Sequence, residues 1–383
     1  MQFVILGGAG IEGRGIVKDL VRSGVDAVVI ADRAVGRAQS LAADLASDRT
    51  RVSAVQADAD DHASLMKVMQ NAGVVVSALG PFYRYGLKTV RAAIEARAPY
   101  VDINDDFDAI EAVLGLDAEA RAAGIPVIIG LGVTPGVSNV CVKHAAKRMD
   151  RVRSVNIAYV GAVGEGGDAV FLHFFHSLCG PVPVLRDGKR IWVAPTAEAP
   201  GAIDFPAPFG TIQAPVIGHP EPIMLPRHIP GIESITVRGA VYPGVLQDTI
   251  QTLAGLGLLS DRPVSLRGTS ITPREFILAC FETHLETPEM RAEIESATAS
   301  LPSPVYGSLR IDVAGERAGH PGACRYTIDA DLCHATDWPA SIGAQMVAAG
   351  EIGQSGVLCP EQCIDPLRFF AELEKRGIWV IMA

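Results

Sequence analysis

The chain has 383 residues, a length that predicts two or three folding units rather than a single small core. Hydrophobic residues make up 49% and charged residues 20%, which are the proportions of an ordinary globular protein and exclude a disordered chain. The formal net charge is -10 and no block of Lys or Arg stands out, which argues against a nucleic-acid partner because phosphates require a basic face.

The first predicted elements are a strand, a glycine-rich turn, a helix and a second strand. Residues 3–6 form a short apolar run, and Gly7-Gly8-Ala9-Gly10-Ile11-Glu12-Gly13 follows it. An apolar stripe at helical spacing continues to Ser23-Gly24, and a second apolar run over residues 27–30 ends at Asp32. This order of elements is typical of a dinucleotide-binding unit.

The three glycines of the G-x-G-x-x-G pattern have separate physical roles. Gly8 permits the tight turn, Gly10 lets the backbone approach a pyrophosphate, and Gly13 lets the helix pack closely on the strand. The helix begins near Ile11 and Glu12, where free N–H groups and the positive end of the helix dipole favour an anion. We therefore expect these five residues to bind the pyrophosphate of a dinucleotide.

Asp32 and Arg33 bear on the choice of dinucleotide. A carboxylate at the end of the second strand can accept hydrogen bonds from the adenosine ribose, and it would repel a 2′-phosphate. Asp32 therefore favours NAD. Arg33 could pair with a 2′-phosphate or stack on the adenine, so NADP stays open.

Strands and helices continue to alternate as far as residue 132. We predict strands over 52–56, 74–78, 100–103 and 125–131, and helices over 64–70, 89–95 and 107–123. The alternation predicts a doubly wound parallel sheet, the Rossmann architecture, whose ligands lie at the carboxyl ends of the strands. This placement adds five residues to the expected cofactor contacts: Asp58, Ala78, Gly80, Pro81 and Phe82.

The alternation stops after residue 136. We predict strands over 152–161, 234–241, 309–313 and 324–332, and helices over 244–255, 335–350 and 366–375. The predicted fold class is therefore α/β. It has an N-terminal Rossmann domain (residues 1–132), an inserted α+β substrate and dimerisation domain (133–334) with a mixed or antiparallel sheet, and C-terminal helices (335–383) that return to the Rossmann domain.

Several motifs together carry a family resemblance. They are Gly8-Ala9-Gly10-Ile11-Glu12-Gly13, Ala31-Asp32-Arg33, Ser77-Ala78-Leu79-Gly80-Pro81-Phe82, Tyr100-Val101-Asp102, Leu131-Gly132-Val133-Thr134-Pro135-Gly136 and Gly356-Val357-Leu358-Cys359-Pro360-Glu361-Gln362. With them the chain resembles the saccharopine dehydrogenase-like oxidoreductases, and among these it is most similar to lysine 6-dehydrogenases and saccharopine reductases. The resemblance covers the Rossmann unit and the tail well and the middle poorly.

The resemblance implies NAD(P)-dependent hydride transfer at a carbon–nitrogen bond of an amino acid or amine, with the substrate domain inserted after the Rossmann domain. One segment departs from the family. Where lysine 6-dehydrogenases carry Thr-Ser-Gly-Gly, residues 217–222 read Ile-Gly-His-Pro-Glu-Pro. Lysine itself is therefore not implied as the substrate.

Amine oxidation needs a base for the ammonium proton, and four residues are catalytic candidates. Asp102 ends a strand at the cofactor face, where it could orient an ammonium or cap the following turn. His173 is three residues from His176 on a predicted helix, so this pair could place a base in the cleft or belong to the core. His219 and Glu221 flank Pro220 in a predicted ordered loop, which we expect to select the substrate; the alternative is a solvated connector.

Seven residues are candidates for substrate binding: Tyr83, Arg84, Tyr85, Thr134, Gly136, Asn139 and His176. Arg84 could clamp a substrate carboxylate or be a solvated surface arginine. Asn139 could bind substrate or cap a helix predicted over 140–147. We predict no metal, because no third ligand lies near the two histidines in sequence.

Further expectations concern the environment of the chain and its partners. The seven cysteines are odd in number and contain no CxxC, so we expect free thiols in a reducing cytoplasm. No apolar stretch is long enough to cross a bilayer and no secretion signal is visible, so we expect no membrane contact. We expect a homodimer that binds a small-molecule substrate.

Two other functions stay open beside the amine dehydrogenase or imine reductase. One is an oxidoreductase of the same fold acting on a C–OH or C=O group, which the altered residues 217–222 support. The other is a dinucleotide-sensing protein without catalysis. A pure sensor has no need of a large second domain, so we favour it least.

Overall fold

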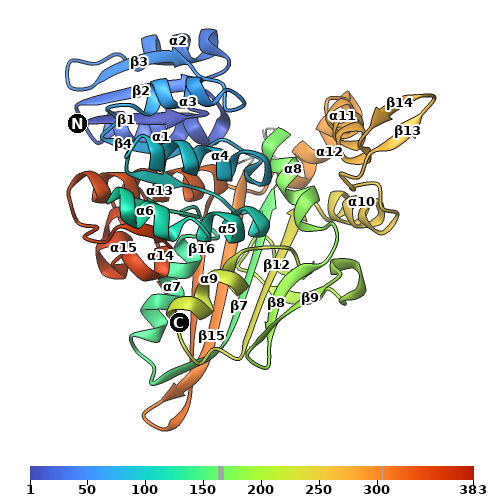
Figure 1. Cartoon of the computed structure of the whole chain (residues 1–383). Helices are drawn as coiled ribbons and strands as arrows, with labels where there is room; N and C mark the ends of the chain where they lie inside the picture. Colours follow the sequence, from blue (N-terminus) through green and yellow to red (C-terminus); the bar gives the residue numbers. More distant parts are fainter. Residues whose placement is uncertain (163–167, 304) are drawn as a thin grey trace. The chain divides into compact units, whose positions relative to one another are not determined.

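The computed structural model describes residues 1–162, 168–303 and 305–383 (Figure 1). It divides into two compact units. The first consists of Met1–His144 with Cys333–Trp379, and the second of Ala145–Leu332 with Val380–Ala383. The sequence predicted domain boundaries at residues 133 and 335. This division into compact units does not test those boundaries, so they stay a prediction.

The first unit alternates strands with helices. Its strands are β1 Gln2–Leu6, β2 Ala27–Asp32, β3 Arg51–Gln56, β4 Val74–Ser77, β5 Tyr100–Asp102, β6 Pro126–Ile128 and β17 Gly356–Leu358. Its helices are α1 Ile11–Arg22, α2 Val35–Asp44, α3 His62–Met69, α4 Phe82–Glu95, α5 Phe107–Leu114, α6 Asp117–Ala123, α7 Val137–Ala146, α13 Leu332–Ala348, α14 Pro360–Cys363 and α15 Pro366–Glu374.

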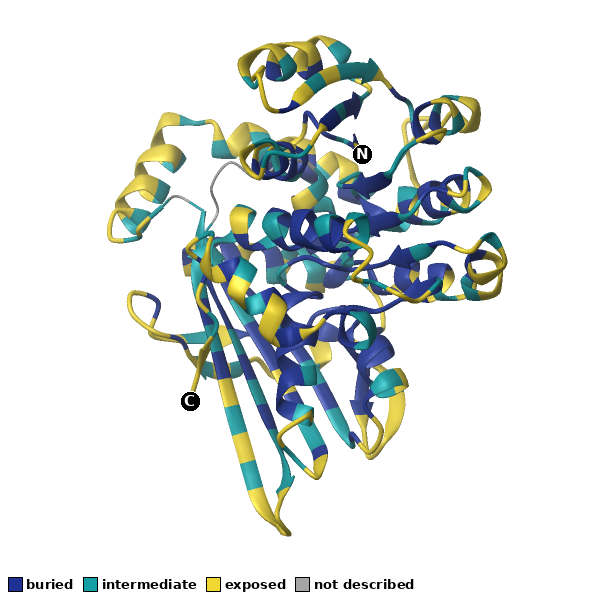
Figure 2. Cartoon of the chain, turned by 90° about the vertical axis from the view of Figure 1, so that its left-hand side faces the viewer, coloured by how far each residue is buried: buried dark blue, intermediate teal, exposed yellow. Residues whose placement is uncertain are grey.

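The strands of the first unit form one parallel sheet in the order β17-β6-β5-β4-β1-β2-β3. Apolar runs form the central strands because both faces are covered by helices, and all four residues of β4 are buried (Figure 2). Strand β1 pairs with β2 on one side and β4 on the other, so the order of strands reverses here, and in doubly wound sheets ligands bind at the carboxyl ends beside such a reversal. The predicted doubly wound parallel sheet is confirmed.

The tail returns to the first unit, as predicted, and it adds a strand as well as helices. Strand β17 pairs with β6 in parallel. Helix α13 packs closely on α1 at Gly15 and on Leu131, which follows β6, at Gly343. A Cβ on Gly15 would lie 1.4 Å from Oδ2 of Asp337, and one on Gly343 would lie 2.2 Å from Cδ2 of Leu131. Only glycine permits this close packing at both positions.

The second unit is richer in elements than the sequence patterns predicted. Its strands are β7 Arg151–Ala162, β8 Val182–Arg186, β9 Lys189–Val193, β10 Gly201–Asp204, β11 Thr211–Ala214, β12 Ser234–Tyr242, β13 Val264–Leu266, β14 Thr269–Ile271, β15 Tyr306–Arg317, β16 His320–Asp331 and β18 Ile381–Met382. Its helices are α8 Asp168–Ser177, α9 Glu221–His228, α10 Gly244–Gly255, α11 Pro273–Leu285 and α12 Pro288–Thr298, with a short 3-10 helix, η1 Pro195–Ala197.

A mixed sheet in the order β18-β16-β15-β7-β12-β8-β9 forms the body of the second unit. Strands β7 and β12 run parallel, and the other pairs are antiparallel. One face carries Ala158, Val160 and Ala240, which pack against Phe205 and Phe209. The predicted α+β unit with a mixed sheet is thus observed.

Several predicted helix boundaries are wrong. Helix α4 begins at Phe82 rather than at residue 89, because Pro81 is compatible with the position before a helix. The single helix predicted over 107–123 is two helices, since α5 ends at Leu114 and α6 begins at Asp117. Helix α7 begins at Val137 rather than at residue 140.

Several elements were not predicted at all. They include α2, α11, α12, α14, the hairpin β13–β14, β17, β18 and most of the chain between β7 and β12. Helix α12 has no buried residue, so its sequence carries no apolar stripe that could mark it.

The expectations about cysteines and membrane spans can be compared with the structure. All seven cysteines are free, as predicted. Within the described parts of the chain, no helix combines the length and the apolar character that a membrane span requires.

Candidate functional site

The glycine turn between β1 and α1 has the geometry that a dinucleotide requires. A Cβ on Gly13 would lie 2.1 Å from the carbonyl oxygen of Gly7, and one on Gly8 would lie 2.9 Å from that of Ile5. Backbone atoms therefore leave no room for a side chain at Gly8 or at Gly13. A Cβ on Gly10 would meet only the Gly7 oxygen, at 3.2 Å, and Gly10 is exposed. Gly10 therefore leaves open space in front of the turn.

Helix α1 begins at this open space. Gly10 is its N-cap in an extended conformation, and it supplies no side chain that could cap the helix. The first backbone bond runs from the N–H of Arg14 to the carbonyl of Gly10, 2.9 Å. The N–H groups of Ile11, Glu12 and Gly13 therefore have no acceptor within the helix, and N–H groups at this end of a helix favour an anion.

Asp32 ties the end of β2 to the glycine turn. Its Oδ2 accepts a hydrogen bond from the N–H of Ala9 (3.0 Å) and its Oδ1 accepts one from the N–H of Ala34 (2.8 Å). The carboxylate thus stands beside the turn, where the adenosine ribose of a dinucleotide would lie. Arg33 next to it is exposed.

The other predicted cofactor residues lie at the ends of β3 and β4. Asp58 is half-buried, and its Oδ1 accepts from the N–H of Asp60 (2.9 Å). The N–H of Ala78 donates to the carbonyl of Leu6 (3.0 Å), which places the end of β4 directly against the turn. Gly80 and Pro81 lead into α4, where Phe82 is buried.

Tyr83, Arg84 and Tyr85 were expected in the segment after the β4 turn, and they lie in the first turn of α4 instead. The N–H of Tyr83 donates to Oδ2 of Asp106 (2.8 Å). The Arg84 guanidinium is exposed and lies 5.7 Å from the centre of the Tyr85 ring. Arg84 is therefore accessible to a ligand carboxylate.

Asp102 is fully buried at the end of β5. Its Oδ1 accepts from the N–H groups of Asn104 (3.1 Å) and Gly130 (2.8 Å), so it joins the loops after β5 and β6. Burial raises the pKa of this carboxyl to about 7, although both backbone hydrogen bonds act to lower it. The geometry is that of a residue that positions the loops after β5 and β6.

A second polar group of the first unit surrounds Asn139. Gly136 has φ +125°, and a Cβ there would lie 2.0 Å from the carbonyl of Gly132. Asn139 lies inside α7, so it is not the N-cap residue that the sequence allowed. Its Oδ1 accepts from the N–H of Gly136 (3.1 Å). Thr134 on the same turn is buried.

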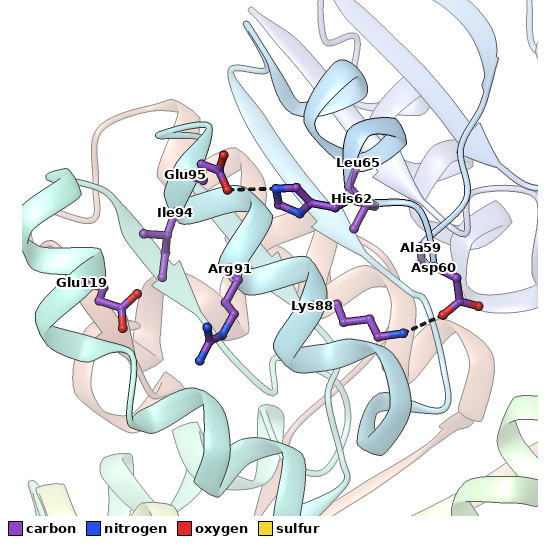
Figure 3. A pocket seen from close by; sticks show the side chains of 9 residues that line it. All are labelled: Ala59, Asp60, His62, Leu65, Lys88, Arg91, Ile94, Glu95 and Glu119. Atoms are coloured by element: carbon purple, nitrogen blue, oxygen red, sulfur yellow. Dashed lines mark hydrogen bonds and ion pairs between the residues drawn. The ribbon is translucent and has the colours of Figure 1, made fainter.

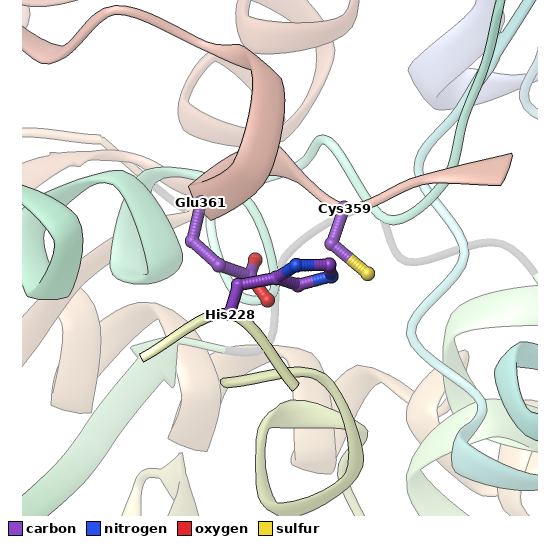
Figure 4. A group of neighbouring side chains, drawn as sticks. All are labelled: His228, Cys359 and Glu361. Carbon is purple, nitrogen blue, oxygen red and sulfur yellow. The ribbon is translucent and has the colours of Figure 1, made fainter. Parts of the chain in front are cut away.

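Glu361 completes this group and was missed as a site residue. The amide nitrogen of Asn139 donates to Oε2 of Glu361, 2.8 Å, and both side chains are buried. Glu361 belongs to α14, one residue beyond Pro360, with Cys359 on the other side of that proline (Figure 4). The tail motif that contains it was noticed for its resemblance, but a sequence gives no sign that Glu361 meets Asn139.

Three of the four catalytic candidates come together in the second unit. Nδ1 of His219 lies 2.9 Å from Oε2 of Glu221, and their side chains are 2% and 0% exposed. The ring of His173 lies edge-on to the His219 ring, with the ring centres 5.6 Å apart. The predicted loop is in fact the start of α9, with Pro220 as N-cap and Glu221 in its first turn. A carboxylate is favoured at this end of a helix.

Tyr159 of β7 is a further member of this cluster that the sequence did not reveal. Its ring centre lies 6.1 Å from that of His219. Gly239 is its partner on β12, and a Cβ on Gly239 would lie 2.7 Å from Cζ of Tyr159. The glycine thus leaves room for the tyrosine ring, a relation that appears only once the two strands are paired.

His176 is one turn beyond His173 on α8 and does not join the cluster. Its Nδ1 lies 3.3 Å from a guanidinium nitrogen of Arg274, which is itself buried. The contact fixes α8 against α11. A role of His176 in substrate binding stays a prediction.

A hollow of about 600 Å³ in the first unit contains none of the predicted site residues. It lies between α3, α4 and α6, and its charged lining is largely paired (Figure 3). His62 lies 2.9 Å from Glu95, and Lys88 lies 2.6 Å from Asp60. We assign it no role in the site.

Comparisons with known proteins give two family matches. Residues 3–128 match the saccharopine dehydrogenase NADP binding domain, and residues 132–378 match the saccharopine dehydrogenase C-terminal domain. The match to an NADP binding domain supports a nicotinamide dinucleotide as cofactor. This match favours NADP over the predicted NAD without deciding between the two cofactors.

A curated relative and a solved structure are also similar. A lipid droplet localized protein from Caenorhabditis elegans is 28% identical over 138 residues, which are 34% of this chain and 32% of that protein. The chain thus spans about a third of that relative's length. Apo saccharopine dehydrogenase (L-Glu forming) from Saccharomyces cerevisiae has 19% sequence identity and a TM-score of 0.68, and the match covers 100% of this chain and 99% of that one. This second likeness shows a shared fold.

Proposed function

We propose that this chain, which belongs to the saccharopine dehydrogenase family of NADP-binding oxidoreductases, transfers hydride at a carbon–nitrogen bond of an amine or amino acid. Membership of this family supports the activity of a dehydrogenase or reductase. The class of substrate is the proposed part.

The first unit fits a dinucleotide. The open space at Gly10 and the N–H groups of Ile11, Glu12 and Gly13 would hold the pyrophosphate, and Asp32 would accept from the adenosine ribose. The nicotinamide of such a cofactor supplies the acceptor or donor of hydride. Side chains of the protein must supply the rest of the chemistry, which is the transfer of the proton.

The family supports the carbon–nitrogen bond in the proposal, and the buried pair of His219 and Glu221 is the observation that supports the proton transfer. Oxidation of an amine requires that its ammonium first lose a proton, which leaves the nitrogen lone pair to stabilise the carbon as hydride departs. In our proposal the Glu221 carboxylate accepts a hydrogen bond from Nδ1–H of His219, and this tautomer of the neutral imidazole keeps a lone pair on Nε2. In our proposal His219 takes the proton.

Glu221 then has a defined electrostatic role. A buried carboxylate stabilises the imidazolium that forms when His219 takes a proton, because the pair is hydrogen-bonded and shielded from water. The edge of His173 and the ring of Tyr159 hold the imidazole in place. In the reverse direction the same imidazolium returns the proton to the reduced nitrogen.

The altered residues 217–222 favour one competing function, the oxidation of an alcohol or the reduction of a carbonyl. His219 and Glu221 both belong to this segment, and an imidazole can serve an alcohol as well as an amine. The two functions differ in the atom bonded to the reacting carbon.

A substrate panel tests the proposal. Primary amines, secondary amines and amino acids are each paired with the alcohol of the same skeleton, and NADP and NAD reduction is followed by nicotinamide absorbance. We expect turnover with members of the amine series and none with their alcohols. Turnover confined to alcohols would replace our proposal with the competing function, and dinucleotide binding without any turnover would indicate a sensor.

A variant pair connects the activity with the cluster. Glu221→Gln should lower kcat and leave cofactor affinity unchanged. Glu233→Gln is the matched control, because Glu233 is a half-exposed carboxylate of the same unit that pairs with Arg151 and Arg153 at the surface. Equal activity of the two variants would remove Glu221 from the mechanism.

A further inference from the structure

Helices α1 and α13 of the first unit lie side by side and run in the same direction. Three contacts, about one helical turn apart, join them, and each joins residues that are 322 positions apart in the sequence: Gly15 with Asp337, Asp19 with Ser341, and Ser23 with Gln345. The hydroxyl of Ser341 donates to Oδ2 of Asp19 over 2.7 Å, and both side chains are buried. A constant separation means that the two helices are parallel and in register, because residues four apart lie on one face of a helix.

The same register places His334 beside the first turn of α1. His334 is one turn before Asp337 on α13, and Glu12 is one turn before Gly15 on α1, so the histidine lies at the level of Glu12. The N–H groups of this first turn of α1 favour the diphosphate of a dinucleotide. His334 therefore lies at the level of the expected diphosphate.

The first turn of α13 is also at the edge of the sheet where ligands bind. Cγ2 of Thr336 lies 3.4 Å from the position of a Cβ on Gly132, in the loop that follows β6. In a doubly wound sheet, ligands bind beside the loops at the carboxyl ends of the strands. The first turns of α1 and α13 thus meet at the same edge of the first unit.

Helix α13 lies on the side of α1 that is away from the expected adenosine. A Cβ on Gly343 would lie 2.2 Å from Cδ2 of Leu131, which follows β6, and 3.8 Å from Cγ1 of Val101 in β5. Strands β5 and β6 are on one side of β1, whereas β2, which ends at Asp32, is on the other. The two halves of a dinucleotide lie on the two sides of this reversal, so the start of α13 adjoins the nicotinamide half.

The imidazole of His334 is oriented by its neighbours and is accessible. Its ring stacks on the ring of Trp338, with the ring centres 4.4 Å apart and the planes at 12°. Nδ1 lies 3.6 Å from Oδ2 of the buried Asp337, and the His334 side chain is 48% exposed. With Nδ1 turned toward the aspartate, Nε2 is the ring nitrogen that can reach a ligand. A ring held in this way loses little conformational freedom when it binds.

We propose that His334 binds the nicotinamide-side phosphate of the dinucleotide, with Nε2–H donating a hydrogen bond to a phosphate oxygen. The histidine adds a side-chain donor to the backbone N–H groups of α1, and a charged acceptor makes such a bond stronger than one between neutral groups. Asp337 and Trp338 orient the ring. This inference rests on the dinucleotide part of the proposed function and is independent of the class of substrate.

Calorimetry on the full chain with NADP and NAD tests the contact. We expect His334→Ala to raise the dissociation constant of the tighter cofactor by roughly tenfold, which corresponds to the loss of one charge-assisted hydrogen bond. His320→Ala is the matched control, because His320 is an exposed histidine of the second unit, and this variant should bind as the wild type does. Unchanged affinity in a folded His334→Ala protein would overturn the proposal, and so would a wild type that binds neither cofactor.

Fragments of the cofactor locate the contact. ADP-ribose carries both phosphates and AMP carries only the adenosine-side phosphate, and the 2′-phosphorylated forms of both are used if NADP binds more tightly. We expect His334→Ala to weaken ADP-ribose as much as the whole cofactor and to leave AMP unchanged. Trp338→Leu should show the same pattern in weaker form, because the imidazole then loses its fixed orientation. Equal losses for both fragments would indicate a structural role of His334, and a loss confined to the whole cofactor would place the contact on the nicotinamide; either result refutes the proposal.

A comparison with Gly10→Val separates this inference from the proposed function. If Gly10→Val abolishes cofactor binding and His334→Ala leaves it unchanged, the dinucleotide lies on α1 and only the role of His334 fails. If the wild type binds a cofactor and neither variant weakens it, the assignment of the dinucleotide to the turn before α1 fails as well.

Discussion

Replacing Gly10 by Val should abolish dinucleotide binding and leave the protein folded. An added Cβ meets only the Gly7 carbonyl at 3.2 Å, and the extended backbone at Gly10 suits a branched residue, so the cost in the free energy of unfolding should stay near that of a poor N-cap, about 1 kcal/mol. The side chain would occupy the space in front of α1. A pyrophosphate would then lose at least two charge-assisted hydrogen bonds from the helix N–H groups, worth ~3–6 kcal/mol together.

That loss corresponds to a dissociation constant raised by roughly 100-fold or more, which isothermal titration calorimetry with NADP and NAD measures directly. Gly255→Val is the matched control, because Gly255 ends α10 of the second unit and a Cβ there meets nothing within 4 Å. Thermal unfolding of both variants establishes that they are folded. A folded Gly10→Val protein that binds either cofactor within a few-fold of wild type would refute the assignment of the turn.

Three further predictions concern single carboxylates and the buried histidine. Asp32→Ala should raise the affinity for NADP relative to the affinity for NAD, because it removes a charge that repels a 2′-phosphate; calorimetry with both cofactors shows whether the ratio of affinities moves. His219→Ala should lower kcat at least tenfold with cofactor affinity unchanged, and stopped-flow hydride transfer at wild-type rate would exclude His219 as the proton acceptor. Asp102→Asn should remove a pH dependence of stability. Burial raises the pKa of Asp102 from 3.8 to about 7, so the folded state holds a proton that the unfolded state releases, and the wild-type free energy of unfolding should fall by on the order of 4 kcal/mol between about pH 4 and pH 7 and level off above it. Urea unfolding across this pH range should show the fall in wild type and its absence in the variant, and parallel curves would contradict the shifted pKa.

The sequence was most informative where all residues of a candidate site lie close together along the chain. The turn from Gly8 to Gly13 and the carboxylate of Asp32 belong to a single strand–helix–strand unit, Gln2–Asp32, and the structure brings them together. The apolar runs predicted the parallel strands because a strand buried on both faces is apolar throughout. In these strands the residues that the local pattern favours are also the residues that tertiary packing requires.

The sequence was least informative where function depends on contacts between distant segments. Asn139 and Glu361 are hydrogen-bonded across more than two hundred residues, and Tyr159 meets His219 only because β7 pairs with β12 opposite Gly239. No spacing or periodicity encodes such contacts.

The structure of the segment around His219 and Glu221 could not be predicted from local sequence either. Two prolines and two polar side chains predict a loop, but Pro220 can precede a helix and the N-terminus of α9 favours the carboxylate of Glu221. Burial of both side chains then follows from packing against α8 and β7. Local preferences alone could not distinguish this arrangement from a solvated connector.

The central claim is that hydride moves to or from a carbon bonded to nitrogen, and isotope transfer tests it most directly. Reduced cofactor deuterated at the transferred position of the nicotinamide is incubated with the enzyme, a carbonyl compound and ammonia or an amine, and the products are analysed by mass spectrometry. Our account predicts an amine with deuterium on the carbon that carries the nitrogen, and a strong loss of this product in His219→Ala. Deuterium found in the alcohol alone, with no labelled amine at any amine concentration, would contradict it.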